Sequence, residues 1–218
     1  MYNETMAKLI LLRHLQSQWN KENRFNGWID TPLLEGQSAI AEKLAKKIFQ
    51  SNKIDVIYCS RLFRNMDTVA RILEYDKKYP LFIHLDIGKM RKKGNFKDLS
   101  EEDIPVYVSE NLDERYYGKL QGENKEEIIK RYGKEKVQIW RRSWNQAPPG
   151  GESLKDVYNR VAPFYKKNIE KDLKLGKNVL IVASHNALRA LIKYIEKISE
   201  KDIANEEMTY GELKIYDV

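Results

Sequence analysis

Several features that mark common protein classes are scarce or missing in this chain of 218 residues. Cys59 is the one cysteine, which excludes an internal disulfide framework and is typical of a reducing cytosol. No apolar run approaches the roughly 20 residues that a membrane span needs. Residues 1–8 lack the basic start and apolar centre of a secretory signal. These absences predict a cytoplasmic globular protein with no membrane partner.

The sequence also lacks the motifs of several kinds of catalytic site. It has no Walker loop for a nucleotide and no Gly-x-Ser-x-Gly turn for a serine nucleophile. It has neither a His-Glu-x-x-His motif nor paired cysteines. We therefore expect no catalytic metal.

The charge of the chain is unbalanced but dispersed. Lys and Arg number 39 against 32 Asp and Glu, which gives a net charge of +7. The lysines are scattered among acidic residues, a pattern more typical of a solvated surface than of a nucleic-acid groove. The charge therefore favours a small anionic ligand and no nucleic-acid partner, with nucleic-acid binding as a minor alternative.

Two of the three histidines follow short apolar runs. Residues 9–12 precede Arg13 and His14, and residues 179–183 precede Ser184 and His185. Each run is apolar on both faces and too short for a core helix, which indicates a buried parallel strand. Ligands of open α/β sheets bind at the carboxyl ends of such strands. If the two strands are neighbours, both imidazoles face one pocket.

The remaining pattern alternates between strands and helices. It predicts one domain over residues 1–218, folded as a three-layer α/β/α sandwich around a mostly parallel sheet. An exposed insertion is expected around residues 86–109. The other predicted strands cover residues 54–59, 79–84, 106–108 and an antiparallel edge at 213–216. The predicted helices cover residues 37–49, a stretch after Ser60, 125–142 with a break at Gly133, 153–175 and 188–198.

Two further stretches carry candidate site residues. Arg64 falls one turn into the helix after Ser60, where a guanidinium and a helix amino terminus together make an anion site. Residues 111–122 are dense in charge and aromatic rings and are bounded by glycine, which suits a site-forming loop.

With these residues the chain resembles the histidine phosphatase superfamily and, within it, the 2,3-bisphosphoglycerate-dependent phosphoglycerate mutases. The resemblance runs from about residue 8 to residue 216. Its matching motifs are Leu-Arg-His at 12–14, Gln-Trp-Asn at 18–20, Phe-Asn-Gly-Trp at 25–28, residues 111–118, Ile-Trp-Arg-Arg at 139–142 and Gly-Glu-Ser-Leu at 151–154.

The resemblance implies a role for each matching residue. His14 is the nucleophile that becomes a phosphohistidine, and Glu114 is the proton donor and acceptor. The transferring phosphoryl group is held by Arg13, Asn20, Arg64 and His185. The substrate is bound by Asn20, Asn26, Gly27, Arg115, Tyr117, Lys125, Arg141, Arg142 and Asn186.

The resemblance also implies an activity and its partners. The chain is expected to interconvert 3-phosphoglycerate and 2-phosphoglycerate in glycolysis and gluconeogenesis, primed by 2,3-bisphosphoglycerate and using no metal. A homodimer or homotetramer is expected. One alternative is a phosphatase of a small phosphomonoester that uses the same phosphohistidine chemistry. Another is a module without activity that binds a phosphoprotein.

Three departures from the family pattern bear on these expectations. Leu15 stands where the family has glycine. An ungapped comparison puts Ser184 at the place of the family's second histidine, so a strand-end bulge is expected to bring His185 there instead. The chain stops at Val218, short of the family's tail over the pocket, which predicts some phosphatase side activity.

Overall fold

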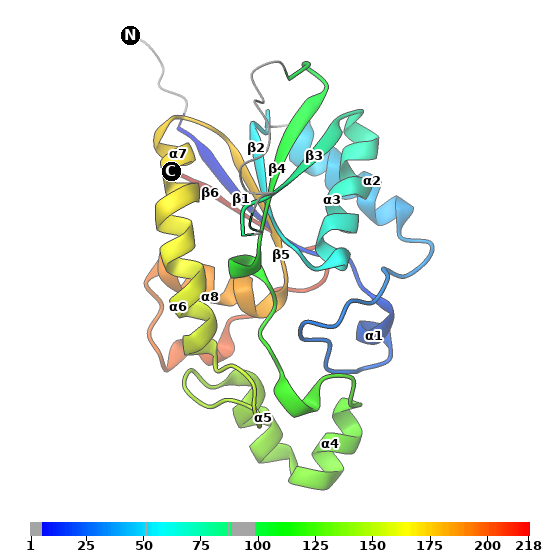
Figure 1. Cartoon of the computed structure of the whole chain (residues 1–218), viewed down its shortest axis with the longest axis vertical. Helices are drawn as coiled ribbons and strands as arrows, with labels where there is room; N and C mark the ends of the chain where they lie inside the picture. Colours follow the sequence, from blue (N-terminus) through cyan, green and yellow to red (C-terminus); the bar gives the residue numbers. More distant parts are fainter. Residues whose placement is uncertain (1–5, 51, 87, 89–98) are drawn as a thin grey trace.

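The computed structural model describes residues 6–50, 52–86, 88 and 99–218. Within this part of the chain, six strands form one sheet in the order β3-β4-β2-β5-β1-β6 (Figure 1). Neighbouring strands pair in parallel except β6, which runs antiparallel beside β1 at one edge. The mostly parallel sheet and its antiparallel edge are therefore confirmed. The strands are β1 (Lys8–Arg13), β2 (Val56–Ser60), β3 (Tyr79–His84), β4 (Asp103–Ser109), β5 (Val179–Ala183) and β6 (Leu213–Asp217).

The first strand shows why the sheet needs cover on both faces. Successive side chains of a strand point to opposite faces. Leu9 and Leu11 accordingly join one buried cluster, and Ile10 and Leu12 join another on the opposite face. All four side chains are fully buried. A run that is apolar throughout is thus explained by a strand buried on both faces.

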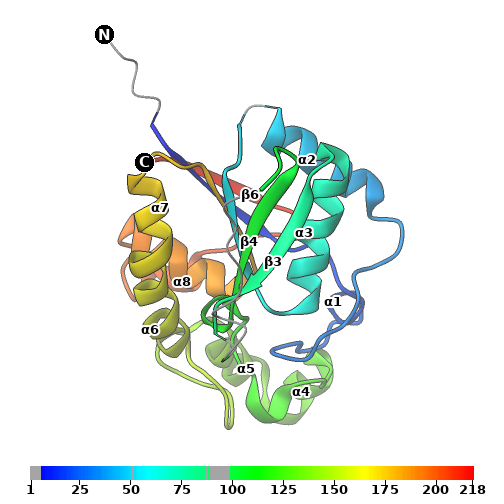
Figure 2. The same ribbon diagram turned by 45° about the horizontal axis from the view of Figure 1, so that its top comes forward.

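Helices cover the two faces and complete the three predicted layers (Figures 1 and 2). One face is covered by α2 (Ser38–Phe49) and α3 (Phe63–Asp76). The other is covered by α6 (Leu154–Phe164), α7 (Glu170–Lys174) and α8 (His185–Glu196), with a π-helical turn at Tyr165–Ile169 joining α6 to α7. In the described part of the chain, no helix is both long and apolar enough to cross a bilayer.

A helical excursion lies beyond the carboxyl ends of the strands (Figure 1). It consists of α4 (Lys125–Tyr132) and α5 (Lys134–Arg142), which meet at Gly133. Gly133 has a φ of 85°, a backbone conformation that favours glycine, and it provides the predicted break. The short α1 (Gln18–Lys21) and single turns at Glu110–Leu112, Gly118–Leu120 and Asp202–Asn205 complete the helical elements of the described residues.

Two predicted boundaries are wrong. Part of the expected exposed insertion at residues 86–109 is β4, which lies between β2 and β3 and buries Ile104, Val106 and Val108. Residues 99–102 are exposed as expected, whereas residues 87 and 89–98 lie outside the described residues. The helix expected at 188–198 begins three residues earlier, at His185. That shift moves His185 from a strand end onto a helix.

Candidate active site

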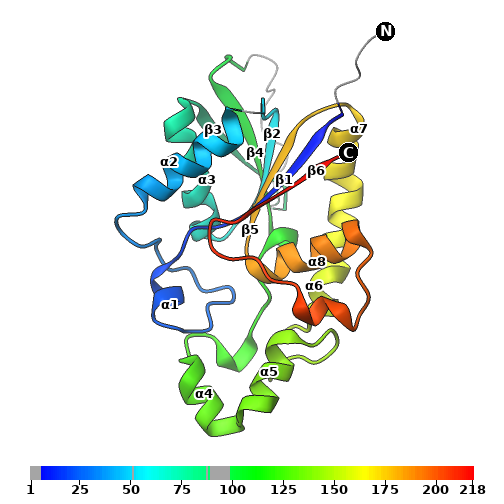
Figure 3. The same cartoon turned by 180° about the vertical axis from the view of Figure 1, so that it is seen from behind.

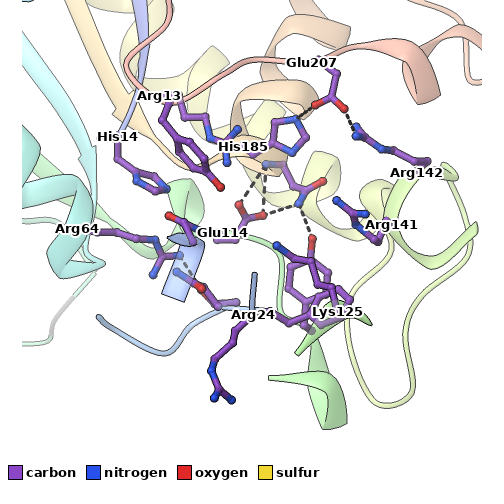
Figure 4. Close-up of a pocket in the computed structure, with 17 residues that line it drawn as sticks. Arg13, His14, Arg24, Arg64, Glu114, Lys125, Arg141, Arg142, His185 and Glu207 are labelled. Carbon is purple, nitrogen blue, oxygen red and sulfur yellow. Dashed lines mark hydrogen bonds and ion pairs between the residues drawn. The ribbon is translucent and has the colours of Figure 1, made fainter. Parts of the chain in front are cut away.

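A cavity of about 280 Å³ opens at the carboxyl ends of β1 and β5, facing the α4–α5 excursion (Figure 4). Both His14 and His185 line it, so the two histidines do share one pocket. The other predicted site residues that line the cavity are Arg13, Asn20, Asn26, Gly27, Arg64, Glu114, Tyr117, Lys125, Arg141, Arg142 and Asn186.

His14 is a buried, neutral imidazole at the end of β1. It directly follows β1, and its side chain is only 2% exposed. Nδ1 lies 2.6 Å from the Leu15 carbonyl oxygen. Because a carbonyl only accepts hydrogen bonds, Nδ1 carries the ring proton and Nε2 keeps its lone pair. Burial, and then the charges of Arg64 and Arg13, hold the pKa of His14 well below its ordinary value.

Two guanidinium groups flank this histidine, and backbone carbonyls fix both of them. Arg64, in the first turn of α3, is 1% exposed and donates to the carbonyls of Gly27 at 2.8 Å and Ile29 at 3.0 Å. Arg13 donates to the Met208 carbonyl. Rigid cations beside a nucleophile are suited to hold the oxygens of a phosphoryl group.

The loop that supplies one of these carbonyls depends on a glycine. Gly27 has a φ of 56°, and a Cβ built there would lie 2.1 Å from Gln121 Oε1. That oxygen also accepts a 2.7 Å hydrogen bond from the Trp28 amide. A side chain at position 27 would thus disturb the loop whose Gly27 carbonyl accepts the Arg64 hydrogen bond.

Glu114 is held at the amino end of α8. Its Oε1 accepts from Asn186 Nδ2 at 2.7 Å and from the Arg115 amide at 2.7 Å. Arg189 donates to Asn186 Oδ1 at 3.0 Å, which fixes the orientation of that amide. The Asn186 backbone N–H lies 3.3 Å from the same carboxylate, as expected for an anion at a helix amino terminus. The side chain of Glu114 is thereby aimed into the cavity (Figure 4).

The helix start, and not a bulge, brings His185 to the cavity. The β1–β5 register continues unbroken to the pair Arg13 and Ala183, so the expected strand-end bulge is wrong. Ser184 is the extended N-cap residue of α8, and its fully buried hydroxyl accepts from Asn65 Nδ2 at 3.1 Å. Burial, followed by the charge of Arg13, holds the pKa of His185 well below its ordinary value.

The opposite end of the cavity is lined by cations from the helical excursion. Lys125 begins α4, and Arg141 and Arg142 end α5. Burial, and then Arg141 and Arg13, lower the pKa of Lys125 to about 8. The positive charges of these side chains repel one another. A bound anion would relieve this repulsion, so the group of cations favours anion binding.

Arg115 is the one predicted site residue that does not line the cavity in this structure. The Arg115 side chain is fully buried, and its guanidinium lies 4.8 Å from the centre of the ring of Tyr117, which lines the cavity. One of its terminal nitrogens donates to the Tyr117 hydroxyl and to the Arg141 carbonyl, each at 3.1 Å. Arg115 therefore positions Tyr117 and the end of α5.

Four further residues that line the cavity were not among the predicted site residues. They are Arg24, Phe25, Glu207 and Tyr210. Arg24 and Phe25 lie beside predicted site residues in the same loop. Glu207 and Tyr210 precede β6, which returns beside β1 (Figure 3). The predicted antiparallel edge at residues 213–216 was the one sequence signal that could have placed the preceding loop at this edge.

The site contains cations, two imidazoles and two carboxylates, those of Glu114 and Glu207. In the part of the chain that the structure describes, no group of three or more His, Cys, Asp or Glu side chains is placed to hold a metal ion. The arrangement can bind an anion at each end, and it places a nucleophilic nitrogen at one of them. Transfer of a phosphoryl group needs such positioning and charge neutralisation.

Comparisons with known proteins agree with this chemistry. The model of the histidine phosphatase superfamily (branch 1) matches residues 9–87 and 96–218. A 2,3-bisphosphoglycerate-dependent phosphoglycerate mutase of Methanococcus vannielii is 43% identical over 216 residues, covering 98% of this chain and 91% of that protein. The protein of the same name from Chlamydia pneumoniae is 43% identical, covering 97% of this chain and 93% of its own length.

Solved structures show the same fold at greater distance. A mycobacterial glucosyl-3-phosphoglycerate phosphatase in complex with VO3 superposes with a TM-score of 0.75 at 23% identity, covering 96% of this chain and 92% of that chain. An α-ribazole phosphatase from Shigella flexneri gives a TM-score of 0.72 at 21% identity, covering 97% and 90%. At this distance the likeness establishes the fold alone.

Proposed function

This chain belongs to the histidine phosphatase superfamily and, within it, to the 2,3-bisphosphoglycerate-dependent phosphoglycerate mutases, and we propose that it interconverts 3-phosphoglycerate and 2-phosphoglycerate through a phosphohistidine at His14. The observation that carries this function is the position of His14. A buried neutral imidazole, with Nε2 free to attack, shares one cavity with two groups of cations.

The first step is attack by Nε2 of His14 on the phosphorus of a phosphate ester. The Nε2–P bond forms as the ester P–O bond breaks, and Glu114 donates a proton to the departing oxygen. Arg13 and Arg64 hold the phosphoryl oxygens, whose charge they neutralise. Asn186 and the start of α8 keep Glu114 at the reacting oxygen.

The second step returns the phosphoryl group to a different carbon. The free hydroxyl of bound phosphoglycerate attacks the phosphorus on His14, Glu114 takes its proton, and the N–P bond breaks. His14 then takes the phosphoryl group from the other carbon as that P–O bond breaks, and Glu114 returns the proton to the departing oxygen. Throughout, Lys125, Arg141 and Arg142 hold the anionic end of the substrate that is not reacting.

The primer that the family name implies, 2,3-bisphosphoglycerate, fits the two ends of the cavity. Arg13 and Arg64 would hold one phosphate, and the cations of the helical excursion would hold the other. When bound, this molecule supplies the phosphoryl group that first loads His14.

Product analysis tests the proposed function. The protein is incubated with 3-phosphoglycerate, with and without 2,3-bisphosphoglycerate, and the products are followed by phosphorus NMR. We expect 2-phosphoglycerate as the product, formed faster when 2,3-bisphosphoglycerate is present. Free phosphate as the main product would instead support the phosphatase, and the absence of both products would favour the binding module.

The assembly and the cellular location of the chain are also proposed. We propose that the chain acts in the cytoplasm, as a homodimer or homotetramer, on a small phosphate ester. Light scattering coupled to size-exclusion chromatography tests the assembly, and a mass equal to that of one 25.7 kDa chain would contradict it.

A further inference from the structure

A carboxylate from the chain itself lies among the cations of the cavity. Glu207 precedes β6, and its Oε2 lies 2.8 Å from His185 Nε2. Its Oε1 forms an ion pair with Arg142. Figure 4 shows the Glu207 carboxylate between these two side chains. No step of the proposed reaction uses the Glu207 carboxylate.

The backbone around Glu207 is fastened to β1, which holds the carboxylate near this position. The Met208 carbonyl accepts from the Arg13 guanidinium. The Gly211 amide donates to the Arg13 carbonyl at 3.1 Å, and the Arg13 amide donates to the Glu212 carbonyl at 3.2 Å. The side chain of Glu207 nevertheless remains half exposed, so it can swing outward without disturbing the core.

The partners of this carboxylate are groups that a bound anion would also use. Arg142 belongs to the far group of cations, and His185 faces the phosphoryl end. An anion that approaches Arg142 therefore competes with Glu207. A carboxylate or phosphate on the ligand can replace the ion pair, whereas a neutral group leaves Arg142 with its internal partner.

We propose that Glu207 determines specificity: its carboxylate occupies the anion subsite between Arg142 and His185, and only a ligand that carries a second anionic group displaces it. The inference rests on the proposed function, because it assumes that the reacting phosphate lies at the His14 end. Plain phosphomonoesters then gain nothing at the far end of the cavity. Phosphoglycerates gain contacts with Arg141 and Lys125 as they displace Glu207.

A matched pair of variants tests this role. Glu207→Gln removes the charge but keeps the shape of the side chain. Glu206→Gln makes the same charge change one residue away, at a carboxylate that accepts from Lys214 at 3.1 Å and does not line the cavity. Calorimetry measures the binding of 3-phosphoglycerate and of glycerol 3-phosphate, which lacks the carboxylate. Unchanged melting temperatures show that the variants are folded.

The expected result is selective. Glu207→Gln binds 3-phosphoglycerate about two- to fivefold more tightly, the size expected for loss of a half-exposed ion pair. Its affinity for glycerol 3-phosphate stays unchanged, and Glu206→Gln changes neither affinity. Equal tightening of both ligands, unchanged or weaker binding of 3-phosphoglycerate by Glu207→Gln, or no binding to any of the proteins would overturn the proposal.

Product analysis of the same proteins separates this inference from the proposed function. If wild type and Glu207→Gln both form 2-phosphoglycerate and bind 3-phosphoglycerate with equal affinity, the mutase stands and the role of Glu207 fails. If neither forms 2-phosphoglycerate but the selective tightening occurs, the mutase fails and the displaced carboxylate stands.

Discussion

The two ends of the cavity are built from different material. At the chemical end, His14 and Arg64 are 2% and 1% exposed, and carbonyl groups of Leu15, Gly27 and Ile29 fix their side chains. His14 directly follows β1, and Arg64 lies in the first turn of α3, which follows β2. At the far end, the cations come from α4 and α5, which lie outside the three layers (Figure 1).

This difference indicates a division of labour. Phosphoryl transfer requires a nucleophile and cations held to within a fraction of an ångström, which a buried sheet edge provides. Recognition of a second anion requires charge more than exact placement, and partly exposed Lys125, Arg141 and Arg142 supply it. Changes at the first end should therefore lower kcat, and changes at the second should raise KM.

The largest effect is expected at His14. His14→Asn keeps a polar side chain of similar reach but removes the nucleophile, so kcat should fall by about 10⁴-fold or more. Binding of 3-phosphoglycerate, measured by calorimetry, should change only a few-fold because the far cations are intact. Turnover within tenfold of wild type would show that the chemical end is wrongly assigned.

A smaller loss of kcat is expected at His185, and comparison with Ser184 shows which of the two residues takes part in the reaction. His185→Ala should lower kcat by about 100-fold, since it removes a donor that faces the transferring group. Ser184→Ala should leave kcat within a few-fold and cost about 1 kcal/mol of stability, because its hydroxyl bonds Asn65. Steady-state kinetics and thermal melts measure both. Wild-type turnover of His185→Ala would remove this histidine from the mechanism.

The far end is tested by Arg141→Ala. Loss of a charge-assisted contact should raise KM for 3-phosphoglycerate by about 30-fold, while hydrolysis of p-nitrophenyl phosphate stays unchanged. Arg131→Ala is the matched control, because Arg131 lies on α4 and pairs with Glu123 at 3.7 Å, away from the cavity. Equal loss on both substrates would contradict the division between the two ends.

The smallest effect is a pH dependence from Lys125. Because its pKa is lowered to about 8, the side chain is a cation below that pH and becomes neutral above it. Anion binding should therefore weaken as pH rises through about 8, lowering kcat/KM for 3-phosphoglycerate by about three- to tenfold. Lys125→Met should lose this part of the pH profile. A profile identical in wild type and variant would exclude Lys125 from binding.

The chemical end was the part most readily predicted from sequence. Apolar runs that stop at Arg13 and Ser184 are local signals, and the parallel pairing of β1 with β5 makes them neighbours. The family motifs supplied Glu114 and the far cations. Residues 106–108 of β4 were predicted as a strand, but the buried start of β4 was assigned to the exposed insertion because charged and glycine-rich residues precede it.

The remaining errors depend on tertiary packing. Arg115 belongs to a matching motif, yet packing against Tyr117 keeps it out of the cavity. Glu207 and Tyr210 belong to no motif, and the path of the chain before β6 alone brings them to the site. The predicted bulge at His185 is wrong, because α8 begins at His185 and its first turn directs the imidazole into the cavity.

Mapping the phosphorylated residue shows directly whether His14 carries the phosphoryl group. The protein is mixed with 2,3-bisphosphoglycerate, quenched at alkaline pH to preserve phosphohistidine, and digested for mass spectrometry, with His14→Asn treated in parallel. We expect phosphate on His14 in wild type and none in the variant. Phosphate on another residue of wild type, or a phosphorylated His14→Asn protein, would contradict it.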